Sequence, residues 1–70
     1  MTDPTYKVSE VVGTSTESVQ QAIRNGIRKA SETIRNLDWF EVEEVRGDIT
    51  EDGEVGRFQV VLRLGFRIED

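Results

Sequence analysis

The stretch NLDWFEVEEVRG, residues 36–47, gathers the side chains of this chain that are best suited to chemistry. It contains the only tryptophan of the sequence, Trp39, together with three glutamates and an arginine. The sequence has no histidine and no cysteine, which excludes a serine triad, a thiol–imidazole pair and a zinc cluster. Lysine or carboxylate chemistry remains open, and so does ligand binding by the indole ring.

The glutamates of this stretch are candidates for a hydrolytic carboxylate pair or for a Mg²⁺ or Ca²⁺ site. In a regular strand Glu41 and Glu43 point to one face and Glu44 to the other, because side chains alternate. Carboxylates are rarely buried, so a solvated charged face is the favoured interpretation. We therefore predict neither a catalytic group nor a metal site here.

Trp39 has two interpretations. As a structural residue it would start a strand and cover the edge of the core, which composition alone favours because large aromatic side chains are mostly buried. As a ligand platform it would stack on a flat aromatic ring, a contact worth about 0.5–1.5 kcal/mol beyond area burial, while Phe40 fills the core. Gln59, on the non-core face of a predicted strand, offers a donor and an acceptor to the edge of a heterocycle; otherwise it is an ordinary polar residue on a wet face.

An amphipathic helix is the clearest element that could position these residues. Its apolar side chains recur at helical spacing: Val19, Ala22, Ile23, Ile27, Ala30, Ile34 and Leu37. Thr14 and Glu17 have capping-box spacing before it, and any hydroxyl of residues 14–16 could cap the helix. The absence of a Gly-Lys-Ser/Thr ending favours such a cap over a phosphate loop. Gly26 lies inside the helix at a cost of about 0.8–1.0 kcal/mol relative to alanine, which close approach to a neighbouring backbone would offset.

Three segments are predicted as strands, at residues 6–12, 39–49 and 55–68, with Gly13 ending the first. Asn36 and Asp38 suit a helix end and a turn before the second strand. A hairpin loop at 49–56 joins the last two, with Asp52-Gly53 at its tip. One face of the last strand carries Phe58, Val60, Leu62, Leu64, Phe66 and Ile68. The fold class is therefore α+β, with β-α-β-β order and a three-stranded antiparallel-type sheet, its last strand central, curved around one helix. We expect a frayed N-terminus at residues 1–4 and a single domain at 5–70.

Size and charge limit the possible functions. Seventy residues bury only about 60% of the surface that the unfolded chain exposes, and without disulfides or zinc we expect oligomerisation to supply the missing stability. A net charge of −5 argues against a nucleic-acid binder. The sequence shows no apolar run of membrane-spanning length and no secretion signal, so we expect a soluble, cytoplasmic protein without a membrane partner.

Three stretches that cover nearly the whole chain resemble the dodecins, small flavin-binding proteins. They are YKVSEVVGTSTES at 6–18, AIRNGIRKASETIRNLDWFEVEEVRG at 22–47 and RFQVVLRLGFRIED at 57–70. The resemblance, which is to bacterial dodecins, implies a hollow, roughly spherical homododecamer. It also implies pairs of flavins at subunit interfaces on two-fold axes, each isoalloxazine ring stacked between its twin and a tryptophan.

The same resemblance assigns roles to individual residues. Trp39 matches the stacking tryptophan, and Gln59 matches the glutamine that hydrogen-bonds the pyrimidine end of the flavin. Val45 and Arg46 match positions that line the pocket in bacterial members, and Arg67 matches an arginine near the same interfaces. The bacterial type favours FMN as the ligand, with riboflavin as an alternative and coenzyme A as a further ligand. The implied function is non-enzymatic binding, storage and photoprotective sequestration of flavin.

Two departures from the bacterial pattern bear on the choice of ligand. The hairpin loop GDITEDGEVGRFQ is one residue longer than expected, and Asp48 stands where a histidine or threonine is common. A carboxylate near the pocket would weaken the attraction for the FMN phosphate, which leaves the choice between FMN and riboflavin open. Two other functions remain as alternatives: a flavin-dependent oxidoreductase, for which no nicotinamide motif is visible, and a structural oligomeric module without flavin.

Overall fold

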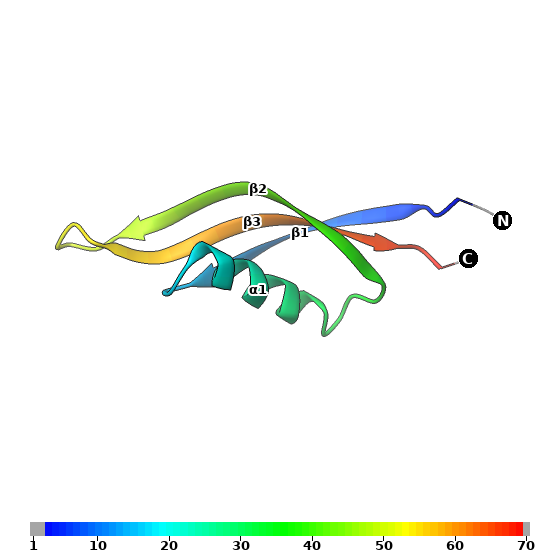
Figure 1. Cartoon of the computed structure of the whole chain (residues 1–70), viewed down its shortest axis with the longest axis horizontal. Helices are drawn as coiled ribbons and strands as arrows, with labels where there is room; N and C mark the ends of the chain where they lie inside the picture. The colour runs from blue at the N-terminus through cyan, green and yellow to red at the C-terminus, as the bar shows by residue number, and fades with distance from the viewer. Residues whose placement is uncertain (1–2, 70) are drawn as a thin grey trace.

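The computed structural model describes residues 3–69, which form one helix and three strands. The elements are β1 (Tyr6–Ser15), α1 (Val19–Ala30), β2 (Leu37–Ile49) and β3 (Val55–Arg67) (Figure 1). β3 lies between β1 and β2 and runs antiparallel to both, which confirms the predicted order and the central place of the last strand. Of the expected frayed start, residues 1–2 lie outside the described residues, and 3–5 belong to no helix or strand.

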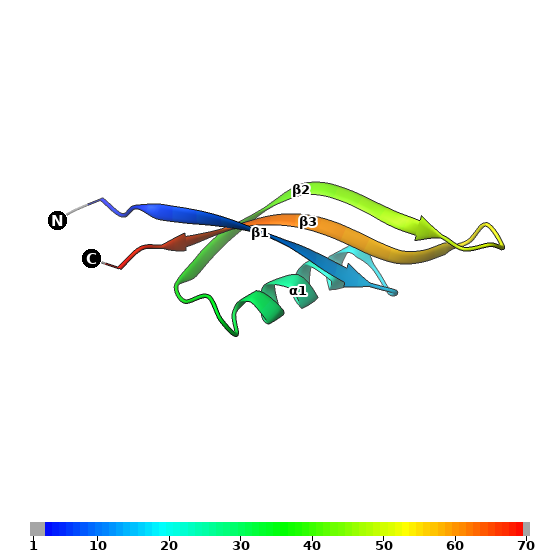
Figure 2. The ribbon, with the colours of Figure 1, turned by 180° about the vertical axis from the view of Figure 1, so that it is seen from behind.

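The core is small and lies between α1 and one face of the sheet. The view from behind shows α1 on that one side of the strands (Figure 2). Its buried apolar members are Ala22, Ala30, Val60, Leu62 and Leu64. The three residues from β3 alternate along the strand as predicted. The accessible surface of 5373 Å² exceeds the roughly 4,450 Å² expected for a compact monomer of this mass. The radius of gyration, 14.6 Å, likewise exceeds about 11 Å, so the subunit is elongated and covers little of its own surface.

The start of α1 differs from the prediction. Ser18 is the N-cap, and its Oγ accepts a hydrogen bond from the Gln21 amide at 2.9 Å. The predicted capping box of Thr14 and Glu17 is therefore wrong, and β1 continues through Gly13 to Ser15. The Oγ of Ser15 accepts from the Glu17 amide at 2.9 Å and holds the turn between strand and helix. This local bond stabilises the turn conformation at residues where the helix would otherwise begin.

The end of α1 also differs, because the apolar stripe continues beyond the helix. α1 ends at Ala30, where Ser31 Oγ donates to the Arg28 carbonyl at 2.7 Å. Ile34 and Leu37 still pack against the core, but from the turn and from the start of β2. Asn36, with φ of 66°, turns the chain into β2, in agreement with the predicted turn. Among residues 3–69, no helix combines the length and the hydropathy that crossing a bilayer requires.

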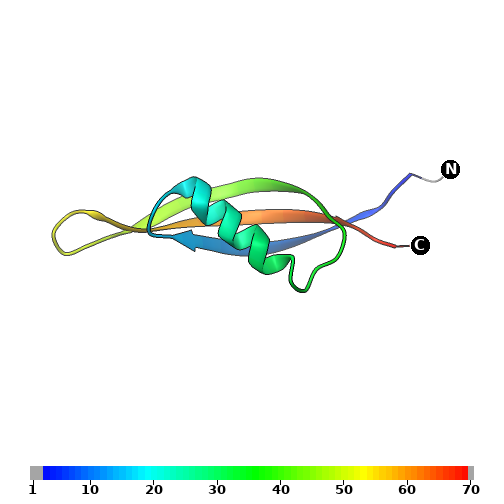
Figure 3. The same ribbon diagram turned by 60° about the horizontal axis from the view of Figure 1, so that its bottom comes forward.

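Two glycines allow α1 to lie close against β1, where the helix crosses the sheet obliquely (Figure 3). A Cβ at Gly26 would lie 3.1 Å from the Gly13 Cα, and a Cβ at Gly13 would overlap the Ala22 carbonyl. The predicted close backbone approach at Gly26 is thereby confirmed. Glycine at position 26 lowers the intrinsic helix stability, but it lets the backbones of α1 and β1 pack directly against each other.

β2 contains two bulges that add curvature to the sheet. Leu37 and Trp39 pair with consecutive residues of β3, as do Val42 and Glu44, so Asp38 and Glu43 are the extra residues. A third irregularity lies between Gly47 and Ile49. The expected strict alternation of the glutamates is consequently wrong, because the register places Glu41 and Glu44 on the same face.

The hairpin between β2 and β3 matches the prediction. The Thr50 amide donates to the Glu54 carbonyl at 2.8 Å, and the Gly53 amide donates to the Thr50 carbonyl at 2.9 Å. Gly53 has φ of 82°, a left-handed conformation that glycine adopts without strain. The hairpin extends beyond α1 at the end of the molecule opposite the start of β1 (Figure 1).

Candidate functional site

The sheet face opposite α1 is not covered by any other element of residues 3–69, and we call it the open face (Figure 1). Residues directly opposed in antiparallel strands share a face, so the register defines its members. They are Tyr6, Val8, Glu10, Val12 and Thr14 of β1, Trp39, Glu41, Glu44 and Arg46 of β2, and Gln59, Val61, Arg63, Gly65 and Arg67 of β3. Four of the five predicted binding residues, Trp39, Arg46, Gln59 and Arg67, therefore lie on the open face.

Trp39 lies on the open face rather than in the core. It pairs with Gly65, and the six-membered ring of its indole covers that glycine. The side chain still leaves the residue 42% exposed, which is high for the largest aromatic residue. Phe40 pairs with Leu64 on the α1 side, but it is 49% exposed, so the prediction that it fills the core is wrong. Trp39 thus presents an accessible aromatic surface on a rigid strand.

Tyr6 adjoins this indole, a contact that the sequence did not reveal. The two ring centroids are 6.1 Å apart with the planes tilted by 56°. The Tyr6 hydroxyl donates to Asp38 Oδ2 at 2.7 Å, which raises the pKa of Tyr6 above its ordinary value, while the charge of Arg67 acts in the opposite direction. Sequence reasoning treated Tyr6 only as a strand residue and Asp38 only as a turn residue, because their contact joins segments 32 positions apart.

Arg46 and Gln59 form a second polar group on the open face. Arg46 Nε donates to Gln59 Oε1 at 2.9 Å, and Arg46 Nη1 donates to Glu44 Oε1 at 2.9 Å. The guanidinium is thus held between a carboxylate and an amide. Because Oε1 of Gln59 is engaged, a ligand acceptor would meet the NH₂ group of that amide. Of the donor and the acceptor that the sequence offered at Gln59, the acceptor is thus used within the protomer.

These two groups lie at opposite ends of the open face. Trp39 pairs with Gly65 and Arg46 pairs with Gln59, six residues away along β3. At about 3.3 Å per residue the separation is roughly 20 Å, more than one isoalloxazine ring can bridge. One protomer therefore does not bring Trp39 and Gln59 onto the same ring, and a site that uses both needs a second copy of the chain.

Val45 is placed differently from the other predicted residues. It pairs with Val60, which puts it on the α1 side of the sheet, and it is half exposed. There it lines a groove of about 300 Å³ together with Arg46, Asp48 and Phe58. Asp48, the residue that departs from the bacterial pattern, is therefore near Val45 and Arg46, and it lies farther from Trp39 along the sheet than Gln59 does.

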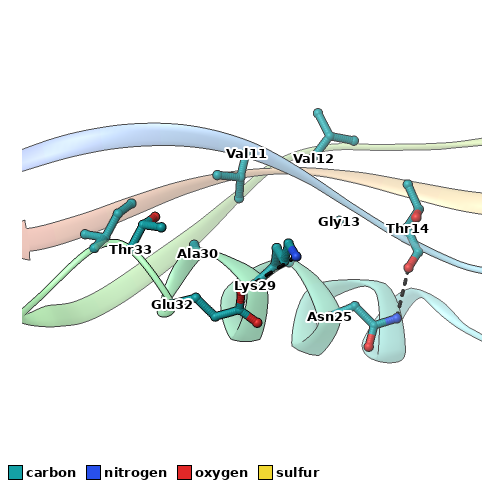
Figure 4. Close-up of a pocket in the computed structure, with 11 residues that line it drawn as sticks. Val11, Val12, Gly13, Thr14, Asn25, Lys29, Ala30, Glu32 and Thr33 are labelled. Carbon is teal, nitrogen blue, oxygen red and sulfur yellow. Dashed lines mark hydrogen bonds and ion pairs between the residues drawn. The ribbon is translucent and has the colours of Figure 1, made fainter.

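A separate groove of about 520 Å³ runs between β1 and α1 (Figure 4). Three of its polar side chains, Asn25, Lys29 and Glu32, contact partners within the chain. Asn25 Nδ2 donates to the Thr14 carbonyl at 3.0 Å, and Lys29 Nζ lies 3.6 Å from Glu32 Oε1. The adjoining Ser15 accepts from backbone amides that a phosphate would otherwise use. This arrangement argues against a phosphate loop, although the helix cap is Ser18 and not the predicted residue.

Carboxylates gather near the middle of the open face. Glu41 Oε1 lies 4.0 Å from Arg63 Nη1. Hydrogen bonding with Glu10, partial desolvation and the charge of Glu10 raise the pKa of Glu43 above its ordinary value. Within residues 3–69, no three acidic side chains are grouped as a metal site would require.

Comparison with known proteins identifies the family to which this arrangement belongs. Residues 5–69 match the sequence model that describes Dodecin. The chain belongs to the dodecin family. It is 52% identical over 65 residues to the dodecin of Thermus thermophilus, an alignment that spans 93% of each chain.

Solved dodecin structures have the same fold. The dodecin of Streptomyces coelicolor is 58% identical, with a TM-score of 0.91 over 100% of this chain and 99% of that one. The dodecin of Streptomyces davaonensis is 52% identical, with a TM-score of 0.92 over 99% of this chain and 100% of that one. The resemblance noted from the sequence and the β-α-β-β fold are therefore confirmed.

Proposed function

We propose that this dodecin binds flavin, in the first place FMN, at the interfaces of a homododecamer in the cytoplasm. It stores the flavin and shields it from photochemistry, and it is not an enzyme. The observation that carries the proposal is the half-exposed indole of Trp39, held over Gly65 on an open sheet face. Gln59, which Arg46 orders on the same face, is the polar group that would bind the edge of the flavin ring.

The residues present fit a flavin. The indole offers a flat electron-rich surface for an electron-poor ring, and the NH₂ group of Gln59 suits an acceptor on the ring edge. Arg67 adds a positive charge to the end of the open face that carries Trp39, which favours an anionic ligand such as FMN over neutral riboflavin. Bound flavin supplies light absorption and redox activity, while these residues bind it, orient it and restrict access to it.

An assembly is supported by three properties of the isolated chain. Its surface exceeds that of a compact monomer, its core is small, and Trp39 and Gln59 are about 20 Å apart on the same protomer. Symmetry would allow each subunit to contribute one residue to each of two sites. Twelve chains of 8.0 kDa give about 96 kDa by light scattering. A dimer at working concentration would contradict the dodecamer, and a monomer would also contradict the shared site.

The proposed function is tested by titrating flavin-stripped protein with FMN and, separately, with riboflavin. We expect strong quenching of flavin fluorescence that saturates near one flavin per subunit, with tighter binding of FMN. Trp39→Ala should weaken binding strongly and leave the mass of the assembly unchanged. If the mass falls while quenching persists, Trp39 is a packing residue. Oxidation of NADH or NADPH by the flavin-loaded protein would instead support an oxidoreductase.

A further inference from the structure

Tyr6 and Trp39 belong to the two edge strands of the sheet, yet their rings meet. Adjacent strands lie about 4.8 Å apart, so β1 and β2 are roughly 10 Å apart with β3 between them. The contact forms because Gly65 has no side chain where the indole crosses β3. The ring centroids of Tyr6 and Trp39 are 6.1 Å apart. The three strands are thus linked above their backbones by two aromatic rings.

The Tyr6 ring is fixed at a second point by Asp38. The bulge at Asp38 brings its carboxylate to the open face beside Trp39, where Oδ2 accepts the Tyr6 hydroxyl at 2.7 Å. The tyrosine is consequently held by its ring against Trp39 and by its hydroxyl against the preceding residue. A side chain with two restraints of this kind limits the rotamers that its neighbour can adopt.

We propose that Tyr6, anchored by Asp38, is a positioning residue of the flavin site that fixes the plane of the Trp39 indole before a ligand arrives. The inference rests on the proposed function, since it concerns the same stacking surface. A side chain that is already ordered loses less rotamer freedom on binding. Removing the restraint should therefore weaken flavin binding by about two- to tenfold.

The sequence makes this testable without flavin, because it contains one tryptophan and one tyrosine. Time-resolved fluorescence anisotropy of the indole reports the motion of Trp39 alone. Tyr6→Phe keeps the ring and removes the bond to Asp38, whereas Tyr6→Leu also removes the ring contact. We expect faster local motion of Trp39 in Tyr6→Phe and more in Tyr6→Leu, with FMN affinity falling in the same order.

Ser18→Ala is the matched control for stability. It removes the N-cap bond to the Gln21 amide and destabilises α1 on the other side of the sheet, so it should leave both the anisotropy and the FMN affinity unchanged. Equal anisotropy in wild type and both Tyr6 variants would overturn the positioning role, even if FMN affinity fell. Absence of FMN binding by the wild-type protein would instead overturn the proposed function, so the two failures are distinguishable.

Discussion

The indole of Trp39 lies directly over Gly65, the residue with which it pairs in the central strand. Any Cβ at that position would occupy the space of the six-membered ring. The proposed flavin site therefore requires glycine at position 65 of β3 as well as the aromatic side chain of Trp39 in β2. This relationship yields the first of five predictions.

Gly65→Ala should displace the indole and reduce FMN affinity by about tenfold, the value of one good stacking contact. The crowding should also lower the free energy of unfolding by roughly 1–3 kcal/mol. The FMN titration and denaturant unfolding measure the two effects. Gly56→Ala is the control on the same strand, because its Cβ would come no closer than 3.4 Å to a neighbour. Equal affinities for the two variants would contradict the arrangement.

Arg46→Ala should weaken FMN and riboflavin to the same extent, by about threefold. The reason is that Arg46 orders the Gln59 amide through the 2.9 Å bond to Oε1, and one such bond between exposed groups contributes modestly. Parallel titrations with the two ligands measure the effect. Arg63→Ala, which removes an arginine of the open face with no bond to Gln59, serves as the control. A loss confined to FMN would show that Arg46 acts on the phosphate instead.

Gly13→Ala should destabilise the subunit by roughly 2 kcal/mol in denaturant unfolding. Its Cβ would overlap the Ala22 carbonyl, and helix backbone has little freedom to move away. Gly26→Ala should be milder, since its nearest contacts are at 3.1 Å and alanine gains helix propensity of about 0.8–1.0 kcal/mol. The opposite order of stabilities would mean that the close approach of α1 to β1 is not limiting.

Glu43→Gln should stabilise the protein at neutral pH. The hydrogen bond to Glu10 and their mutual repulsion raise the pKa of Glu43, whereas Arg63 lowers it and Glu41 raises it further. A raised carboxyl pKa stabilises the folded state below the ordinary value of 4.5 and loses that contribution as pH rises. The melting temperature of Glu43→Gln should therefore exceed that of wild type at pH 7 and approach it in acid. Glu51→Gln at the hairpin controls for net charge, and a gain that persists in acid would exclude this cause.

Tyr6 should titrate above the ordinary tyrosine pKa of 10.0, because its hydroxyl donates to Asp38; burial and the Asp38 charge act in the same direction, and Arg67 opposes them. The protonated Tyr6 hydroxyl therefore adds to the free energy of unfolding below pH 10, and this contribution is lost as the pH rises through the pKa of the folded state. Ultraviolet absorbance of the single tyrosine follows the titration. Asp38→Ala should return the pKa toward its ordinary value, and an unchanged titration would argue against the hydrogen bond in solution.

Local sequence pattern was sufficient for most of the fold. The apolar alternation of β3, the helical stripe that begins at Val19 and the Asp52-Gly53 turn depend on neighbours a few positions apart, so they could be predicted. The helix boundaries could not, because Ser15 and Ser31 each compete locally for backbone hydrogen bonds. Helical spacing also extended the predicted helix too far, because Ile34 packs against the core from the turn that follows α1.

The sequence by itself determined the family, the β-α-β-β order and the identity of Trp39 and Gln59 as the candidate ligand-binding residues. Only the tertiary structure decided that they lie about 20 Å apart on one face, that Val45 lies on the other, and that Tyr6 meets the indole. The physical reason is that these relationships arise from strand register and two bulges. Register pairs residues distant in the chain, and one inserted residue changes the face of every side chain after it.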